Sequence, residues 1–358
     1  LNNKIAISIA SIMLLILSYF LIPVFYKEDI VKASLIKQTF NKYDFQIEFN
    51  EKIKYGLFPK PFFYTKNLNI KYNNKILANS DYVKFYISFN NLFSENILTK
   101  NLVFQNTEFN VNSNNINFFL KVLNSSDREN KFIFKKSRFF YNDENKDLLF
   151  LSKIDDLSFF YDDVNDSQKV NSNFEVFNIP FKLNVSKNIT NKNKSIKLSS
   201  KKLRLDIDTS VVHDGTKITG IFDIETINKK NLFKYIISDN SLNFLSLDKN
   251  FRGDVNFKPF YFSTDLNFKY INQRKIFQSK SLLIDLLDSE LLNNPNLNAS
   301  INININQIDK FELLKNFVSR VHLGEGKILM KDFKTTWNNS VLINSSEIEF
   351  LNDIDGKK

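Results

Sequence analysis

The sequence predicts a mainly β protein in which one N-terminal transmembrane helix precedes a long antiparallel, curved or twisted β-sheet. We expect this sheet to form an open groove and to carry a few short helices. Three observations lead to this fold class: an uninterrupted apolar run near the N-terminus, repeated alternation of apolar and polar residues over the rest, and short polar turns between the alternating segments.

The apolar run extends from Ile5 to Tyr26, carries no charge, and lies between Lys4 and Lys27. At about 1.5 Å per helical residue it is long enough to cross a hydrocarbon core of roughly 30 Å. We therefore expect residues 1–27 to form a short N-terminal tail and a membrane anchor. The anchor residues expected to contact lipid are Ile5, Leu14, Leu15, Leu17, Phe20, Leu21 and Tyr26.

A cleaved signal peptide is the alternative interpretation of the same run. Cleavable signals have a shorter apolar centre and small residues at the exit, whereas residues 20–26 are bulky and aromatic. Tyr19, Phe25 and Tyr26 also suit the interfacial belt in which aromatic rings settle. These features favour an uncleaved anchor.

Helical spacing of apolar residues indicates four helices after the anchor. The first, at 28–43, continues from it, and the others are expected at 115–123, 231–237 and 308–321. The segment 308–321 has the most regular apolar stripe, and Gly324 follows as a stop signal.

Period-2 alternation dominates everything else. In a strand, successive side chains point to opposite faces, so each such segment has one apolar and one polar face, as is typical of antiparallel sheets with one wet side. The alternating segments are 45–49, 68–72, 85–89, 181–185, 203–208, 266–270 and 297–306, and polar turns are expected at 72–75, 142–145 and 213–216.

Composition limits the partners and the chemistry. The chain has 358 residues and a net charge of +10, but its lysines are scattered and form no dense basic track, so we expect no nucleic-acid partner. Abundant Lys, Asn, Ile and Phe are also what an AT-rich genome produces. With no Cys, the chain has neither disulfides nor thiolate chemistry.

No pattern of catalytic or metal-binding residues is present. The two histidines, His213 and His322, have no second His, Cys or carboxylate cluster at ligand spacing; we expect the first in a turn and the second at a helix end. The acidic pairs 155–156 and 162–163 are expected in turns and lack the spacing of a calcium loop. We therefore expect no enzymatic activity, no catalytic residue, no metal and no cofactor.

Residues 28–111 carry the most specific pattern in the chain. A short helix is followed by an alternating strand, an aromatic–Pro step, a strand entered through Leu-Ala and then Asp, and an Asn-Leu-Phe turn before the next strand pair. These segments are 45–49, 53–61, 68–70, 76–85, 91–93 and 102–111. In this order they resemble the N-terminal region of the AsmA family of bacterial envelope proteins. The family often has Gly before the first strand and in the turn after it, where this chain has Tyr43-Asp44 and Asn50-Glu51.

The resemblance implies a single-pass protein of the bacterial inner membrane, with residues 28–358 forming an AsmA-like periplasmic β-groove domain. It also implies kinship with bridge-like lipid carriers, in which a bent sheet presents an apolar inner face to acyl chains. The implied partners are membrane phospholipids, the inner membrane and other envelope-assembly proteins, and the implied process is envelope biogenesis and outer-membrane assembly. The groove candidates are Ile70, Tyr72, Phe85, Ile87, Phe89, Phe104, Leu183, Leu205, Phe268, Tyr270, Ile301 and Ile303.

Two alternatives remain open at this point. The apolar positions could face a second sheet in an ordinary sandwich, giving a scaffold for outer-membrane protein assembly that binds no lipid. A membrane-attached hydrolase using Asp or Glu is the third hypothesis, although no nucleophile–base constellation supports it. The chain begins with Leu and reaches Lys358 without an obvious terminal element, so we also expect either a truncated family member or an incomplete sequence.

Overall fold

The computed structural model describes residues 2–350 except 94–96, 113, 125–127, 129–130, 143–146, 191–192, 215–216, 227–228, 239, 258, 272–293 and 309–312. The described residues form a mainly β protein whose 20 strands belong to one mixed sheet, which confirms the predicted fold class. The chain divides into two compact units, Leu1–Phe140 with Lys153–Ser172, and Tyr141–Ser152 with Asn173–Lys358.

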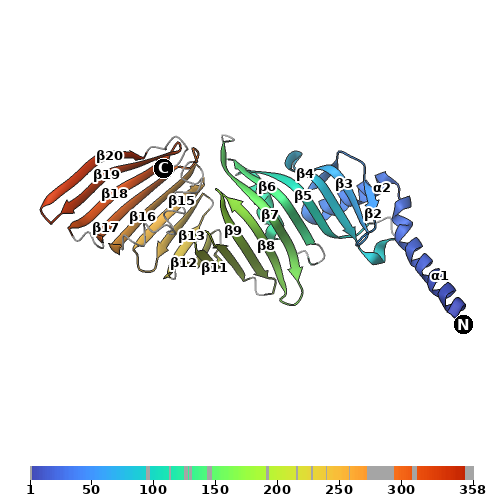
Figure 1. The fold of residues 1–358 in the computed structure, drawn as a ribbon. Helices are drawn as coiled ribbons and strands as arrows, with labels where there is room; N and C mark the ends of the chain where they lie inside the picture. The colour runs from blue at the N-terminus through green and yellow to red at the C-terminus, as the bar shows by residue number, and fades with distance from the viewer. Residues whose placement is uncertain are drawn as a thin grey trace. The chain divides into compact units, whose positions relative to one another are not determined.

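Unit 1 contains the helices and the first strands (Figure 1). In chain order its elements are α1 (Asn2–Leu21), η1 (Ile22–Phe25), α2 (Glu28–Tyr43), β1 (Gln46–Phe49), β2 (Lys54–Gly56), β3 (Phe62–Tyr72), β4 (Lys75–Ile87), η2 (Phe89–Asn91), β5 (Thr99–Asn112) and α3 (Ile116–Asn124). Strands β6 (Lys131–Asn142), β7 (Leu148–Asp162) and β8 (Ser167–Val176) contribute residues to both units.

Strands β1 to β5 of unit 1 pair antiparallel. Strand β3 pairs with β1, β2 and β4, and β4 pairs with β5. The helices predicted at 28–43 and 115–123 are confirmed as α2 and α3. Asp44 ends α2 with a left-handed φ of 60°, a conformation that Asp tolerates better than most residues.

Helix α2 covers one face of the unit 1 sheet because its apolar residues recur at helical spacing. Val31 and Leu35 are buried, and the Tyr43 ring stacks on Phe45 and packs edge-on against Phe132. Each such fully buried side chain stabilises the fold by about 1.5–3 kcal/mol. We call the sheet face beneath α2 the inner face of unit 1.

The inner face is crossed by a row of backbone irregularities. Along β3, β4 and β5, buried inward-facing side chains occur at every second residue of the sequence. Each strand has one exception, where two successive inward-facing residues are three positions apart. Asn67, Asp81 and Asn106 lie at these exceptions, which are aligned across the three strands. Asn67 and Asn106 are left-handed, with φ of 49° and 51°, and Lys136 of β6 repeats this conformation. We call these four residues the bulge row; such insertions bend a strand and increase its twist.

Buried hydroxyl groups stabilise the backbone beside the bulge row. The Thr107 hydroxyl donates to Ser80 Oγ at 3.0 Å, and Ser80 Oγ lies 3.2 Å from the Gln105 carbonyl oxygen. The Thr107 amide donates to Ser137 Oγ, which in turn donates to the Lys135 carbonyl oxygen. These side chains supply partners for buried backbone groups where the regular ladder is interrupted.

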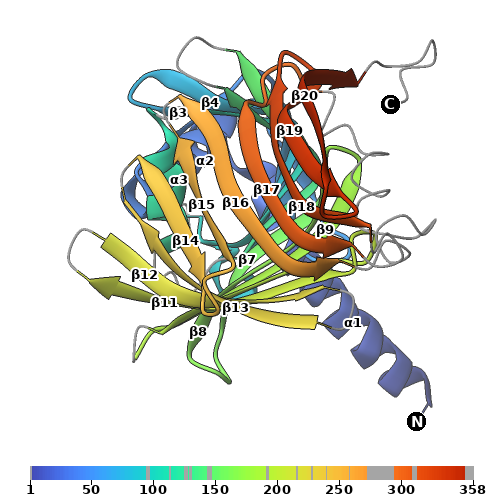
Figure 2. The same ribbon diagram turned by 90° about the vertical axis from the view of Figure 1, so that its left-hand side faces the viewer.

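Unit 2 is built almost entirely of consecutive antiparallel strands. They are β9 (Ile179–Asn188), β10 (Lys194–Ser200), β11 (Leu205–Asp214), β12 (Lys217–Thr226), β13 (Lys229–Ile237), β14 (Ser241–Ser246), β15 (Phe251–Phe257), β16 (Phe260–Ile271), β17 (Ala299–Ile308), β18 (Leu314–Gly324), β19 (Lys327–Trp337) and β20 (Val341–Phe350). Each described pair from β9 to β20 is antiparallel except β16 with β17, which is parallel. Figure 2 shows β15–β19 bending along their length.

Several local predictions are corrected in unit 2. The helix predicted at 231–237 is wrong, because these residues form most of β13. The helix predicted at 308–321 is also wrong: 308 ends β17 and 314–321 belong to β18, while 309–312 lie outside the described residues. His322 therefore lies in a strand, and so does His213, in β11.

The antiparallel expectation and the predicted turns need smaller corrections. The parallel pair β16–β17 departs from a simple meander, because a tight turn can join only antiparallel neighbours. Asp155 and Asp156 lie inside β7 rather than in a turn. The turn predicted at 72–75 is confirmed, whereas those predicted at 142–145 and 213–216 lie largely outside the described residues.

Three tyrosine hydroxyls join the end of the apolar helix to the strands and connections of unit 1. Tyr55 of β2 donates to the Phe20 carbonyl oxygen at 2.6 Å, Tyr19 donates to the Phe89 carbonyl oxygen, and Tyr26 donates to the Leu92 carbonyl oxygen. Within the described residues, Ser8–Phe25 is the one segment whose length and composition would let it cross a membrane. The end of that segment is therefore held against β2 and the β4–β5 connection.

Replacing Thr107 with Val should loosen the strands beside the bulge row. The valine keeps the shape and the backbone amide but loses the hydroxyl donated to Ser80, at a cost of about 1 kcal/mol. Amide hydrogen exchange of β4 and β5 should accelerate roughly fivefold, measured by mass spectrometry on the full chain in detergent. Thr219→Val, on the polar face of β12, is the matched control, and unchanged exchange in β4 and β5 would contradict the role given to the hydroxyl row.

The Tyr55 phenol should resist ionisation because burial raises its pKa to about 12. A raised folded-state pKa favours the neutral phenol, so its contribution to the junction is complete below the ordinary pKa of 10.0 and is lost as pH rises through about 12. At about pH 11, the phenolate absorbance of the protein should therefore be close to that of a Tyr55→Phe variant. If the absorbance of the variant at that pH is instead lower than that of the unchanged protein by the amount expected for one ionised tyrosine, Tyr55 titrates like an exposed tyrosine.

Candidate functional site

The most extensive surface feature of unit 2 is a sheet face on which apolar side chains line up from strand to strand. Residues directly opposite each other in a β-ladder share a face. Ile207 is opposite Ile224, Phe222 is opposite Phe233, and Tyr235 is opposite Phe244. The same register continues through later strands, so we call this set the apolar face of unit 2: Leu183, Val185, Ile196, Leu198, Leu205, Ile207, Phe222, Ile224, Phe233, Tyr235, Phe244, Val255, Phe262, Leu266, Phe268, Ile301, Ile303, Ile305, Phe317 and Val321.

Aromatic rings form a continuous layer on this face. The rings of Phe222 and Phe233 stack with centroids 5.0 Å apart, and Phe244 stacks with Phe262 at 6.4 Å. Gly220 leaves room for this layer, because a Cβ atom there would lie 2.4 Å from the Tyr235 hydroxyl oxygen. Most of the side chains on the face are only half-buried, so the layer is not sealed by other described residues.

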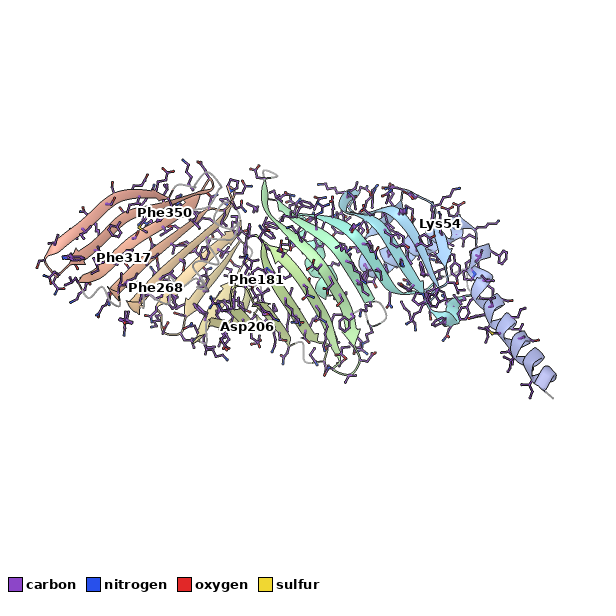
Figure 3. The ribbon with its side chains drawn as sticks, in the orientation of Figure 1. Lys54, Phe181, Asp206, Phe268, Phe317 and Phe350 are labelled. Carbon is purple, nitrogen blue, oxygen red and sulfur yellow. The ribbon has the colours of Figure 1, made fainter. Side chains whose placement is uncertain are left out.

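The opposite face of the same strands carries ion pairs, together with exposed apolar side chains such as Leu232 and Ile236. Lys197 pairs with Asp208 at 2.9 Å, Arg252 pairs with Asp265, and Asn302 donates to Asp265 at 2.7 Å. The hydrogen bonds from Asn302 and Arg252 hold the pKa of Asp265 below its usual value. Figure 3 shows the side chains of the strands and labels Asp206, which lies on the face with the ion pairs, and Phe268 and Phe317, which belong to the apolar face of unit 2. The aromatic layer therefore lies on one face of unit 2, and these ion pairs lie on the other.

An apolar pocket of about 500 Å³ opens on the apolar face of unit 2 near its first strands. Its lining includes Phe150, Phe174 and Phe181, together with Phe260 and Leu297 from later in the chain. The segment before β17 reaches this pocket because the Asn294 amide donates to the Leu149 carbonyl oxygen at 2.7 Å. The sheet of unit 2 thus curls enough to bring residues 145 positions apart into contact around an apolar volume.

Two lysines lie at the end of the apolar rows on β9 and β10. Lys187 and Lys194 are directly opposite each other and follow Val185 and Ile196 on the same face. Burial, followed by repulsion from Lys187, lowers the pKa of Lys194. An anionic group placed between them would relieve that repulsion, and a phosphate has this chemistry.

Unit 1 encloses a smaller cavity of about 190 Å³ on its inner face. The lining is entirely apolar and includes Ala78, Phe104, Phe118, Phe134 and Leu157. Helix α3 closes one side, where Phe118 packs 4.6 Å from the Tyr72 ring. Such apolar cavities exclude water and accept apolar molecules of matching size.

The predicted groove residues separate into two groups in the structure. In unit 1, Ile70, Phe85, Ile87 and Phe104 are buried on the inner face, and Phe85 is only 1% exposed. Tyr72 is half-buried, and Phe89 lies outside the strand, in η2, with its ring exposed. Five of the remaining predicted residues belong to the apolar face of unit 2: Leu183, Leu205, Phe268, Ile301 and Ile303. Tyr270 follows Phe268 on the same side of β16, but its side chain is exposed.

The sequence patterns missed several strands of the apolar face. Phe233, Tyr235 and Ile237 alternate as a strand requires, but Leu232 and Ile236 on the other face are also apolar and hide the period. Phe222 and Ile224 stand around Asp223 in a detectable alternation that is too short to be recognised alone. The pocket residues Phe174 and Phe177 give no signal, because the pocket arises from the curl of the sheet.

The anchor residues lie on the exposed surface of the N-terminal helix. Ile5, Leu14, Leu15, Leu17 and Leu21 are exposed in the structure, whereas Phe20 and Tyr26 are half-buried where the helix meets unit 1. Within the described part of the chain, no three His, Asp or Glu side chains are grouped so that they could hold a metal ion.

No protein-family model matches the chain, and no curated protein matches its sequence.

Filling the unit 1 cavity should stabilise the protein. Ala78 is buried and lines the cavity, so Ala78→Leu adds three carbons to an empty apolar volume and should raise the free energy of unfolding by about 0.5–2 kcal/mol. Ala299 is the matched control: it is buried among Leu323 and Ile328, where Ala299→Leu should cost about 1–3 kcal/mol. Urea unfolding of the full chain in detergent measures both, and equal destabilisation by the two variants would mean that the cavity is already occupied by side chains.

Proposed function

We propose that this chain is a membrane-anchored, non-enzymatic lipid-handling protein that holds or passes phospholipid acyl chains along the apolar face of its curved sheet. In this proposal the N-terminal helix crosses the bacterial inner membrane and residues 28–358 lie in the periplasm. The protein serves envelope biogenesis, including outer-membrane assembly.

The observation that carries the proposal is the apolar face of unit 2. A contiguous set of half-buried aromatic and branched side chains is costly to leave in water, and such patches mark binding surfaces for apolar partners. The pocket of about 500 Å³ on this face has the size and lining of a ligand site, with almost no polar groups to select a polar substrate. Acyl chains fit this chemistry because they need an apolar surface and no hydrogen-bonding partner.

The ends of the strands supply the polar half of a phospholipid site. Lys187 and Lys194 stand beyond Val185 and Ile196 on the same face, so an acyl chain lying over the apolar rows would bring its phosphate near two ammonium groups. Long lysine stems also lie along apolar surface while keeping the charge at its edge. The lowered pKa of Lys194 would return toward its ordinary value when an anion binds.

The membrane location rests on the N-terminal helix and on the resemblance of residues 28–111 to the AsmA family. Ser8–Phe25 is long and apolar enough to cross a bilayer. A protein tied to the membrane by this helix would have its apolar face within reach of membrane lipids. The inner-membrane and periplasmic assignments come from the family resemblance alone.

One observation favours a second candidate function, a periplasmic scaffold that assists outer-membrane protein assembly without binding lipid. The inner face of unit 1 is covered by α2 and α3, and its aromatic residues pack as in an ordinary core. If the apolar face of unit 2 were covered in the same way by a partner protein, no lipid would be needed.

Site-specific photocrosslinking separates the two candidates. A photoreactive phenylalanine at Phe268 or Ile303, on the apolar face, should form adducts with phospholipid in cells or in lipid vesicles, detected by mass spectrometry. The same group at Lys269 or Asn302, on the opposite face of the same strands, is the matched control and should remain free of lipid.

Adducts with protein only, or equal lipid labelling at all four positions, would reject the lipid proposal. Native mass spectrometry of the gently purified protein gives an independent readout, because a carrier should leave the membrane with lipid bound. A crosslinker at Phe85, beneath α2, should capture no lipid if the inner face of unit 1 is closed.

A further inference from the structure

Four exposed aromatic side chains surround the end of the N-terminal helix. Phe25 is 85% exposed, Phe58 is 88% exposed and Phe93 is 70% exposed, and Phe89 is also exposed. We call these four residues the aromatic collar. Phenylalanine rings this accessible are unusual on a surface that faces only water.

The collar residues come from three separate segments that the fold brings to one end of the sheet. Phe25 ends η1, Phe58 lies in the β2–β3 connection, and Phe89 and Phe93 lie between β4 and β5. Phe62 at the start of β3 is opposite Tyr86 near the end of β4, so the two connections emerge at the same end of these strands. The Ile87 amide donates to the Pro61 carbonyl oxygen at 3.0 Å and fixes the connections beside each other.

The same end of the sheet holds the N-terminal helix. The Phe93 ring lies 4.9 Å from the Tyr19 ring, and the Phe89 ring lies 5.8 Å from the Phe20 ring. Tyr26 and Tyr55 donate hydroxyl hydrogen bonds across the same junction. The collar is therefore continuous with the lipid-facing surface that α1 would present in a bilayer.

We propose that the aromatic collar inserts into the headgroup layer of the membrane that α1 crosses, so that unit 1 is attached to the bilayer by its strand ends as well as by its helix. The partner is the lipid surface itself. Phenylalanine is among the side chains that membrane-surface segments bury at the boundary between headgroups and acyl chains. The exposed Lys27 and Lys60, each two residues from Phe25 or Phe58, suit the phosphate level of that layer.

The proposal rests on α1 spanning the membrane, which belongs to the proposed function, but it does not depend on lipid transport. The chain has no cysteine, so single labels can be introduced without removing native residues. Phe58→Cys and Phe93→Cys, each carrying a nitroxide, would be reconstituted with the full chain into vesicles of phosphatidylcholine and phosphatidylglycerol. Val164→Cys is the matched control, since Val164 is an apolar residue of unit 1 that is 92% exposed in the β7–β8 turn.

Electron paramagnetic resonance then compares collisions of each label with oxygen, which concentrates in lipid, and with a water-soluble nickel complex. The labels at 58 and 93 should show nickel collision rates severalfold below that of the label at 164, together with higher oxygen collision rates. Flotation of the vesicles verifies that the protein is membrane-integral.

Membrane-integral protein whose labels at 58 and 93 collide with nickel as often as the label at 164 would overturn the collar and leave the anchor intact. Protein that does not float with the vesicles would overturn the anchor and the collar together. The two proposals can also fail separately. If the labels at 58 and 93 are protected from nickel, but photocrosslinkers at Phe268 and Ile303 capture no lipid, the collar is supported and lipid handling is rejected.

Discussion

The structure depends on keeping apolar side chains on one face of a sheet whose strands also bend. Bending interrupts the regular backbone ladder, and each interruption leaves buried peptide groups in need of partners. In unit 1 the left-handed Asn67 and Asn106 absorb the bend, and the hydroxyls of Ser80 and Thr107 bond at the interrupted positions. Because the extra residue occurs at the same level in neighbouring strands, the inward and outward faces stay in phase from strand to strand.

Unit 2 repeats this device in its last strands. Asn316 and Asp332 are left-handed, and the register of β18 with β19 shifts beside them. The Ser319 hydroxyl donates to the Lys331 carbonyl oxygen and the Thr335 hydroxyl donates to the Lys315 carbonyl oxygen. Phe317 and Phe333 remain in ring contact at 5.4 Å across the irregularity. The same combination of a left-handed residue and a nearby hydroxyl thus preserves a one-sided apolar layer in both units.

The two units use their apolar faces differently because different elements cover them. In unit 1, Val31 and Leu35 of α2 and Phe118 of α3 occupy the inner face and reduce the free volume to a small cavity. In unit 2, the described residues leave the layer half-exposed and open around a larger pocket. The inner face of unit 1 is therefore closed by its own helices, whereas the apolar face of unit 2 is left open by the described residues.

The sequence by itself determined the class of the fold, the apolar helix and the one-sided strands, because composition and period-2 alternation are local properties that burial of one face enforces. It misassigned 308–321, where apolar residues of two adjoining strands happen to fall at helical spacing, and 231–237, where Leu232 and Ile236 mask the alternation of β13. Only the tertiary structure decided that Phe85 and Phe104 lie beneath a helix while Phe268 and Ile303 lie on an open face, since identical alternation is compatible with either cover. The pocket around Phe174, the parallel pairing of β16 with β17 and the gathering of Phe25, Phe58 and Phe93 were likewise decided by long-range contacts, because curvature and cover depend on which distant segments meet and not on the residues of any one strand.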